Sequence, residues 1–157
     1  MKIAKSSRHS KITGDFAERL VLYWLSKYGF ECAYVDHVGL DIIARNPHTK
    51  ELMGVSVKAR SRNTGTESTC LSFGKDNLTK LEKACHDFDC TPYFALVVDA
   101  ADSISGFILS QKHLLTISPP SKNTVSIKMT KDAISTYESD VAIKTFKFIT
   151  KTTNWWA

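Results

Sequence analysis

The sequence has few cysteines, glycines and prolines, and it has no long apolar run. Its 157 residues include four cysteines, seven glycines and four prolines. Four irregularly spaced cysteines do not make the disulfide framework of a small secreted protein, so we expect them to be reduced. The apolar runs, such as residues 20–25, are far shorter than the roughly 20 residues of a membrane-spanning helix, and the N-terminus has no apolar signal core. We expect a cytoplasmic, intracellular protein with no membrane partner.

Composition and patterning predict one folded unit. A hydrophobic content of 43% and a charged content of 24% exclude disordered, collagen-like and coiled-coil chains. The sequence shows no repeat, no low-complexity tract and no linker long enough to separate two domains. We therefore expect a single domain over residues 1–157, divided into a basic arm at 1–13, a core at 14–98 and a C-terminal extension at 99–157.

The first 13 residues contain no acidic side chain. They hold Lys2, Lys5, Arg8 and Lys11, whereas the rest of the chain is nearly neutral, with 17 basic and 16 acidic residues. Such an arm favours a nucleic-acid partner, because each neutralised phosphate releases counterions. Basic termini are also common as solvated leaders, and the arm alone favours that interpretation.

The spacing of apolar residues predicts a mixed α/β order. We expect a helix over residues 14–28, capped by Thr13, with Asp15 in its first turn and Gly29 as its stop. Three strands of an antiparallel meander should follow at 31–36, 40–45 and 52–60, with a turn at 46–50. Further strands are expected at 70–73, 93–98, 106–109, 125–129 and 143–149, and further helices at 76–88 and 131–138. The last part should extend the sheet.

The first helix carries an acid beside its apolar arc. At 100° per residue, Glu18 lies between Leu25 and Leu22 on the helix surface. Carboxylates are seldom buried unless they are paired or bind a cation, so this azimuth indicates a partner in the interior or at the lip of a cleft. An exposed Glu18 paired with a neighbouring base is an equally good interpretation.

The hairpin that follows brings three polar groups to one face of the sheet. If the turn is centred near 48–49, paired positions sum to about 97, which sets Asp41 opposite Ser56 and diagonal to Lys58. Strand alternation should turn Leu40, Ile42 and Ala44 to the opposite face. A carboxylate, a hydroxyl and an ammonium in one patch suit phosphodiester hydrolysis assisted by Mg²⁺, with the lysine orienting water.

A surface salt bridge between Asp41 and Lys58 is the alternative to a hydrolytic site at this hairpin. Gly39 favours the functional interpretation, because it allows backbone or a ligand to approach closely. Arg60 and Arg62 favour it too, because they extend the positive side of the patch.

Four segments in this order resemble the motifs of the PD-(D/E)XK nuclease superfamily. They are residues 14–19, 28–30, 39–44 and 55–60, and the closest resemblance is to archaeal-type Holliday junction resolvases. The resemblance covers about residues 14–98, while residues 99–157 match no family that we can name.

The resemblance implies a restriction-endonuclease-like α/β core, built as a mixed sheet from a helix, three strands, a helix and a strand. It also implies a DNA endonuclease that uses Mg²⁺ or Mn²⁺, with branched or otherwise structured DNA as a candidate substrate and a homodimer as a candidate assembly. The implied catalytic residues are Glu18, Asp41, Ser56 and Lys58, and the implied metal-binding residues are Glu18, Asp41, Ser56 and Val57. The candidate DNA-binding residues are Lys2, Lys5, Arg8, Lys11, Arg60, Arg62 and Lys75.

Ser56 departs from the family pattern, which has Glu, Asp or Gln at this position. A serine hydroxyl is a neutral and poor Mg²⁺ ligand, so metal affinity falls unless another acid, such as Asp36 or Asp76, supplies the missing charge. A cleavage-deficient DNA-binding protein that keeps the nuclease fold is therefore an alternative. A protein-interaction domain is a third hypothesis, suggested by Trp155, Trp156 and the unmatched residues 99–157.

Overall fold

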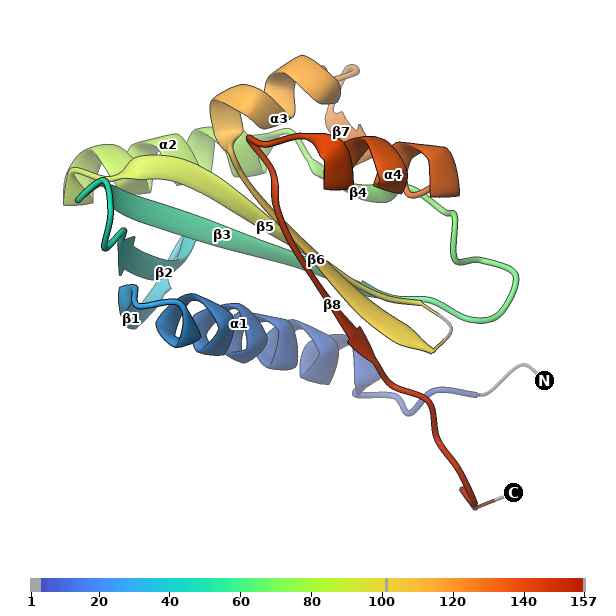
Figure 1. Cartoon of the computed structure of the whole chain (residues 1–157). Helices are drawn as coiled ribbons and strands as arrows, with labels where there is room; N and C mark the ends of the chain where they lie inside the picture. Colours follow the sequence, from blue (N-terminus) through green and yellow to red (C-terminus); the bar gives the residue numbers. More distant parts are fainter. Residues whose placement is uncertain (1–3, 101, 157) are drawn as a thin grey trace.

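A six-stranded mixed sheet forms the centre of the computed structural model, which describes residues 4–100 and 102–156 (Figure 1). Its strand order is β1-β2-β3-β5-β6-β8. These strands are β1 (Glu31–His37), β2 (Leu40–Arg45), β3 (Leu52–Ser61), β5 (Thr91–Ala100), β6 (Ser103–Ser110) and β8 (Lys144–Ile149). A separate two-stranded sheet pairs β4 (Leu71–Gly74) with β7 (Thr124–Ile127).

Helices cover both faces of the central sheet. Figure 1 shows α1 (His9–Lys27) on one face, with α2 (Asp76–Phe88), α3 (Gln111–Ile117) and α4 (Lys131–Ser139) on the other. Two apolar clusters correspond to these layers. One joins Ala17, Val21 and Leu25 of α1 to the sheet, and the other joins Leu78 and Leu81 of α2 to it. None of the helices in the described residues is long and apolar enough to span a membrane.

Helix α1 begins earlier than the sequence predicts. It starts at His9, so Thr13 lies inside the helix, where its hydroxyl donates to the carbonyl oxygen of His9 at 2.7 Å. The predictions of a Thr13 cap and of Asp15 in the first turn are therefore wrong. Asp15 forms an ion pair with Lys11 one turn earlier, at 2.9 Å, and such pairs stabilise a helix in the basic segment. Gly29 ends the helix as predicted, with a φ of +86°.

The meander forms with the predicted register. Strand β2 pairs antiparallel with both β1 and β3, and Ile42 lies opposite Val55 in the β2–β3 ladder. Strand β3 then pairs in parallel with β5, and β6 and β8 extend the sheet beyond β5, as expected.

Two features of the C-terminal half differ from what the sequence predicts. The strand predicted at 125–129 does not extend the central sheet. It forms β7, which pairs with β4, because Val125 and Ile127 are buried in the cluster under α2. The short helix α3 was not predicted. The hydroxyl of Ser110 caps it by accepting the N–H of His113 at 3.2 Å.

Candidate active site

Asp41 lies where β2 and β3 separate. The β2–β3 ladder ends at the pair Ile42 and Val55. Beyond that pair, the Asp41 carboxylate accepts the backbone N–H of Val57 at 2.6 Å. In a continuous ladder a main-chain carbonyl oxygen would accept such an N–H, so here the Asp41 side chain takes the place of that carbonyl. Asp41 therefore contacts the backbone of Val57. The sequence had predicted that Asp41 pairs with Ser56 in the ladder, and it does not.

The sequence predicts that Leu40, Ile42 and Ala44 share one face of β2, and this is correct for only two of them. Ile42 and Ala44 pack in the cluster under α1, but Leu40 packs in the cluster under α2. The change coincides with a register shift between Tyr34 and His37 in the neighbouring strand β1. An irregularity of this kind twists the chain and changes the direction of the side chains beside it.

Gly39 fixes the turn that leads into Asp41. Its φ is +85°, and a Cβ at this position would lie 2.6 Å from the carbonyl carbon of Lys80. The close approach that the sequence predicted is therefore made by the backbone of α2. Only glycine fits both the positive φ and this contact, which hold Asp41 next to the start of α2.

Lys58 is held by a residue that the sequence analysis missed. Its Nζ donates to Oδ1 of Asn77 at 2.8 Å, and Nδ2 of Asn77 donates to the carbonyl oxygen of Gly74 at 2.9 Å. The Lys58 ammonium also lies 5.7 Å from the centre of the Phe73 ring. The sequence offered one indication of this contact, which is that Asn77 lies in the first turn of the helix predicted at 76–88.

Glu18 faces this region from α1. It is half-buried, and Oε2 accepts the hydroxyl of Tyr34 at 2.7 Å. The guanidinium of Arg19 lies 4.0 Å from the centre of the Tyr34 ring. The partner of Glu18 is therefore a phenol on β1 and not a neighbouring base.

The pKa shifts show that Glu18, Asp41 and Lys58 share one electrostatic environment. Burial raises the pKa of Asp41, and the charge of Glu18 raises it further, while the Val57 N–H and the charge of Lys58 lower it. Burial lowers the pKa of Lys58, and the charge of Asp41 opposes that effect. Three elements thus bring two acids and one ammonium within electrostatic reach of each other.

Ser56 lies beside this group and is only 2% exposed. Among the described residues there is no group of three His, Cys, Asp or Glu side chains that could hold a metal ion. Asp76 forms an ion pair with Lys80 at 2.7 Å, and its charge also acts on Lys58, while Asp36 is an exposed residue of β1. A role of either residue as the missing acid stays a prediction.

The donor set nevertheless suits one type of cation. Mg²⁺ keeps several waters and is commonly held by one or two carboxylates together with substrate phosphates. Asp41 and Glu18 provide two carboxylates, and Ser56 provides a hydroxyl. Val57 could contribute only its carbonyl oxygen, since its side chain is apolar. The donor types of these residues are therefore compatible with a Mg²⁺ ion that is completed by water and phosphate, and their binding of a cation stays a prediction.

The arginines predicted to bind DNA make structural bonds. The guanidinium of Arg60 donates to the carbonyl oxygens of Ala59 and Ser72, and that of Arg62 donates to the carbonyl oxygen of Cys70 at 2.7 Å. These bonds tie the end of β3 to β4 and to the residues just before it. A role of either arginine in DNA binding stays a prediction.

The predicted lysines are spread over the N-terminal segment and the start of α2. Lys5 Nζ donates to both the carbonyl and hydroxyl oxygens of Ser61, at 2.7 and 2.9 Å, which fixes the arm against β3. Lys11 is engaged with Asp15, while Arg8 and Lys75 are exposed immediately before α1 and α2. Lys2 lies outside the described residues.

The arrangement of the central sheet and its helices is shared with a solved structure. The chain is similar to the 1.6 Å structure of Hjc from Archaeoglobus fulgidus, described as a Holliday junction resolvase from an archaeal hyperthermophile. The TM-score is 0.57 and the sequence identity is 20%, over 78% of this chain and 88% of that chain. No family model and no curated protein matches the sequence.

The likeness confirms the predicted fold class. It also covers more of the chain than the predicted core at 14–98, which amounts to about 54% of the 157 residues. Part of the predicted C-terminal extension therefore belongs to the shared fold. The observed sheet agrees with this, since β6 and β8 continue it beyond β5.

Proposed function

We propose that this protein is a DNA endonuclease that uses Mg²⁺ or Mn²⁺. The observation that supports this most strongly is the electrostatic coupling of Glu18, Asp41 and Lys58 where β2 and β3 separate, in a fold similar to that of a Holliday junction resolvase. Asp41 and Lys58 lie on different strands and both have shifted pKa values, a combination that is typical of catalytic sites.

Each of the three side chains has a hydrogen-bond partner that supports the role we propose for it. The Val57 N–H orients the Asp41 carboxylate, and the Tyr34 hydroxyl orients that of Glu18, so both can hold a cation and a water molecule. A bound divalent cation supplies charge stabilisation at the phosphate and lowers the pKa of water. Asn77 directs the Lys58 ammonium, which stabilises negative charge as it develops on the phosphate oxygens.

Branched DNA is the substrate that we propose. The similar structure is described as a Holliday junction resolvase, which suggests a substrate with more than one duplex arm. The net charge of +5 and the acid-free segment at 1–13 suit a phosphate-rich partner. An enzyme that cuts two strands commonly pairs identical sites, so we also propose a homodimer.

A second function is favoured by Ser56. Without a third acid, metal affinity falls, and the protein could bind DNA without cleaving it. This alternative keeps the fold, the basic arm and the DNA partner, and differs from the first only in turnover.

The test is incubation of the purified protein with four-way junction, nicked and linear DNA in Mg²⁺ or Mn²⁺. We expect cleavage of the junction, and we expect its loss in Asp41→Asn and Lys58→Met but not in Lys83→Met, which removes an exposed ammonium on α2. Cleavage that survives Asp41→Asn and Lys58→Met would remove these residues from the mechanism. Salt-dependent binding without turnover, even in Ser56→Glu, would establish the non-cleaving alternative. Undetectable binding at low salt would favour an interaction domain.

A further inference from the structure

Both ends of the chain are basic and free of acids. Residues 141–157 contain Lys144, Lys147 and Lys151 but no Asp or Glu, just as residues 1–13 contain four basic residues and no acid. Neither the last strand nor the residues that follow it belong to the candidate active site around Asp41 and Lys58.

The two basic segments lie at the same end of the central sheet. One cross-strand row runs from Ser61 on β3 through Asp99 and Ile104 to Phe148 on β8. Three strand spacings of about 4.8 Å separate its ends by roughly 14 Å. Lys5 is bonded to Ser61 at one end of this row, and Lys147 precedes Phe148 at the other. Figure 1 shows the end of β8 and the start of α1 on the same side of the molecule.

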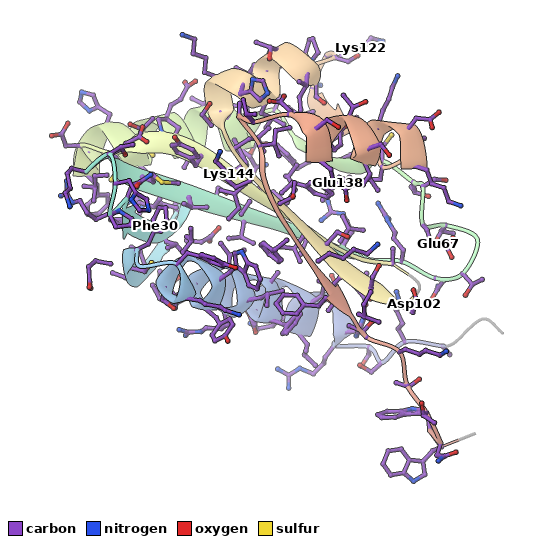
Figure 2. All side chains as sticks on the ribbon, viewed as in Figure 1. Phe30, Glu67, Asp102, Lys122, Glu138 and Lys144 are labelled. Atoms are coloured by element: carbon purple, nitrogen blue, oxygen red, sulfur yellow. The ribbon has the colours of Figure 1, made fainter. Side chains whose placement is uncertain are left out.

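The tail after β8 carries two exposed tryptophans. It leaves the sheet at Thr150, whose N–H donates to the carbonyl oxygen of Asp102 at 2.6 Å. Figure 2 labels Asp102. Trp155 is 67% exposed and Trp156 is 85% exposed, and their ring centres lie 5.0 Å apart at 80°. The contact between the two rings covers little of either, so both present open aromatic surface to a ligand.

We propose that residues 150–156 bind unpaired nucleotides of the DNA substrate. Bases stack on Trp155 and Trp156, and Lys147 and Lys151 bind the adjoining phosphates. Aromatic rings interleaved with basic side chains are how proteins bind single-stranded nucleic acid, because every base has a stacking face. The inference rests on the proposed action on DNA. It specifies that the protein recognises unpaired nucleotides of a branched substrate.

The distances allow a DNA strand to reach both sites. Ser61 lies three residues beyond Lys58 on β3, a rise of about 10 Å. A tail of seven residues, 150–156, spans up to roughly 23 Å when extended. A strand that passes Lys58 therefore continues for several nucleotides along β3 and across the sheet before it meets the tail.

A second copy of the chain is the competing partner for the tail. An apolar hollow of about 500 Å³ lies between the end of α1 and the start of β8, lined by Trp24, Tyr28 and Tyr93 among others. Figure 2 labels Phe30 and Lys144 there, at the opposite end of the molecule from Asp102. No acid is among the residues that line this hollow, although a second hollow, which Lys147 itself lines, includes Glu67, Asp102 and Glu138. We favour nucleotides because the tail combines exposed aromatic rings with a lysine and no acid.

The experiment measures the affinity of the full chain for fluorescein-labelled oligothymidylate of about 20 nucleotides and for a blunt duplex with the same number of phosphates. Chelator is present, so that cleavage plays no part. We expect the double variant Trp155→Ala with Trp156→Ala to bind the single strand about five-fold or more weakly, with little change for the duplex. The corresponding double Phe variant should keep most of the affinity. Val141→Ala, which trims an exposed apolar residue remote from the tail, is the matched control.

The salt dependence separates the lysines from the tryptophans. Lys151→Ala should lower the slope of log affinity against log salt by about 0.7, whereas the tryptophan variants leave that slope unchanged. Equal binding by the wild type and the double Ala variant would overturn the inference. A change in oligomeric state on sedimentation, without a change in affinity, would overturn it in favour of a second copy. Because binding is measured without metal, the experiment tests the role of the tail even if the protein does not cleave DNA.

Discussion

Nζ of Lys58 donates a hydrogen bond to Oδ1 of Asn77 at 2.8 Å, and this bond joins the central strand β3 to the first turn of α2. Asn77 is itself held by the carbonyl oxygen of Gly74. The ammonium therefore has a fixed position beside Asp41 although burial lowers its pKa.

Asn77→Ala should slow cleavage more than it weakens DNA binding. A hydrogen bond to a charged group contributes about 1.5–3 kcal/mol, so the rate at saturating DNA should fall by about ten-fold or more. Thr79→Ala changes an exposed residue of the same helix and should leave the rate near that of the wild type. Single-turnover kinetics and anisotropy binding distinguish the two effects. An equal rate for Asn77→Ala would show that Lys58 needs no positioning by α2.

Ser56→Glu should lower the Mg²⁺ concentration needed for half-maximal cleavage, because it adds a third acid beside Asp41. The same change should lower the free energy of unfolding without metal by several kcal/mol, because position 56 is only 2% exposed and an unpaired carboxylate there is costly to bury. Mg²⁺ or Mn²⁺ should restore part of this loss. Ser56→Ala is the control for both measurements. If Ser56→Glu needs as much Mg²⁺ as the wild type does, position 56 does not belong to the cation site.

The sequence predicted most elements of the first half of the fold. Apolar spacing located α2 and the meander, and the turn at 46–50 set the register that pairs Ile42 with Val55. Alternation could not show that the ladder ends before Asp41, because the break depends on the register shift in β1 and on the contact of Gly39 with α2.

The sequence was less informative where tertiary contacts decide the structure. Strand β7 reads like any other strand, and only its packing with β4 under α2 keeps it out of the central sheet. Asn77 resembles an ordinary residue in the first turn of a helix until the lysine that it binds is in place. The partner of Glu18 was undecided for the same reason, because Tyr34 lies on another element.

Gly39→Ala should destabilise the fold more than Gly65→Ala does. Both glycines have a φ near +85° to +89°, so both substitutions carry the backbone strain of a positive φ, about 1 kcal/mol. Only at Gly39 would the new Cβ also meet the backbone of Lys80, at 2.6 Å, and that clash adds to the loss. Urea unfolding of the two variants measures the difference. Equal losses would mean that the turn before Asp41 can move away from α2.

Gly14→Ala should stabilise the protein by about 0.5–1 kcal/mol. Gly14 lies inside α1, where a Cβ would meet nothing within 4 Å, and alanine has the higher helix propensity. The test is thermal unfolding of the variant beside the wild type. A lower melting temperature would contradict the placement of residues 9–13 in the helix.

Stability should depend on pH through Asp140. The N–H of Ala142 and the ring of His113 lower the pKa of Asp140 below 3.8, so the ionised form is favoured in the folded state. Its contribution is present above pH 3.8 and is lost as the pH falls through the lowered value. Asp140→Asn should therefore lower the melting temperature near neutral pH, and the difference from the wild type should shrink in acid. A difference that stays constant down to about pH 2 would contradict this sign.

The most direct test of the cation site is cleavage of the protein itself by Fe²⁺ bound in place of Mg²⁺. With ascorbate and peroxide, Fe²⁺ generates radicals that cut the backbone beside the ion, and mass spectrometry of the fragments locates the cuts. We predict cuts near residues 18, 41 and 56–58, suppressed by excess Mg²⁺ and absent in Asp41→Asn. Cuts elsewhere, or the same cuts in Asp41→Asn, would contradict a metal centre at this hairpin.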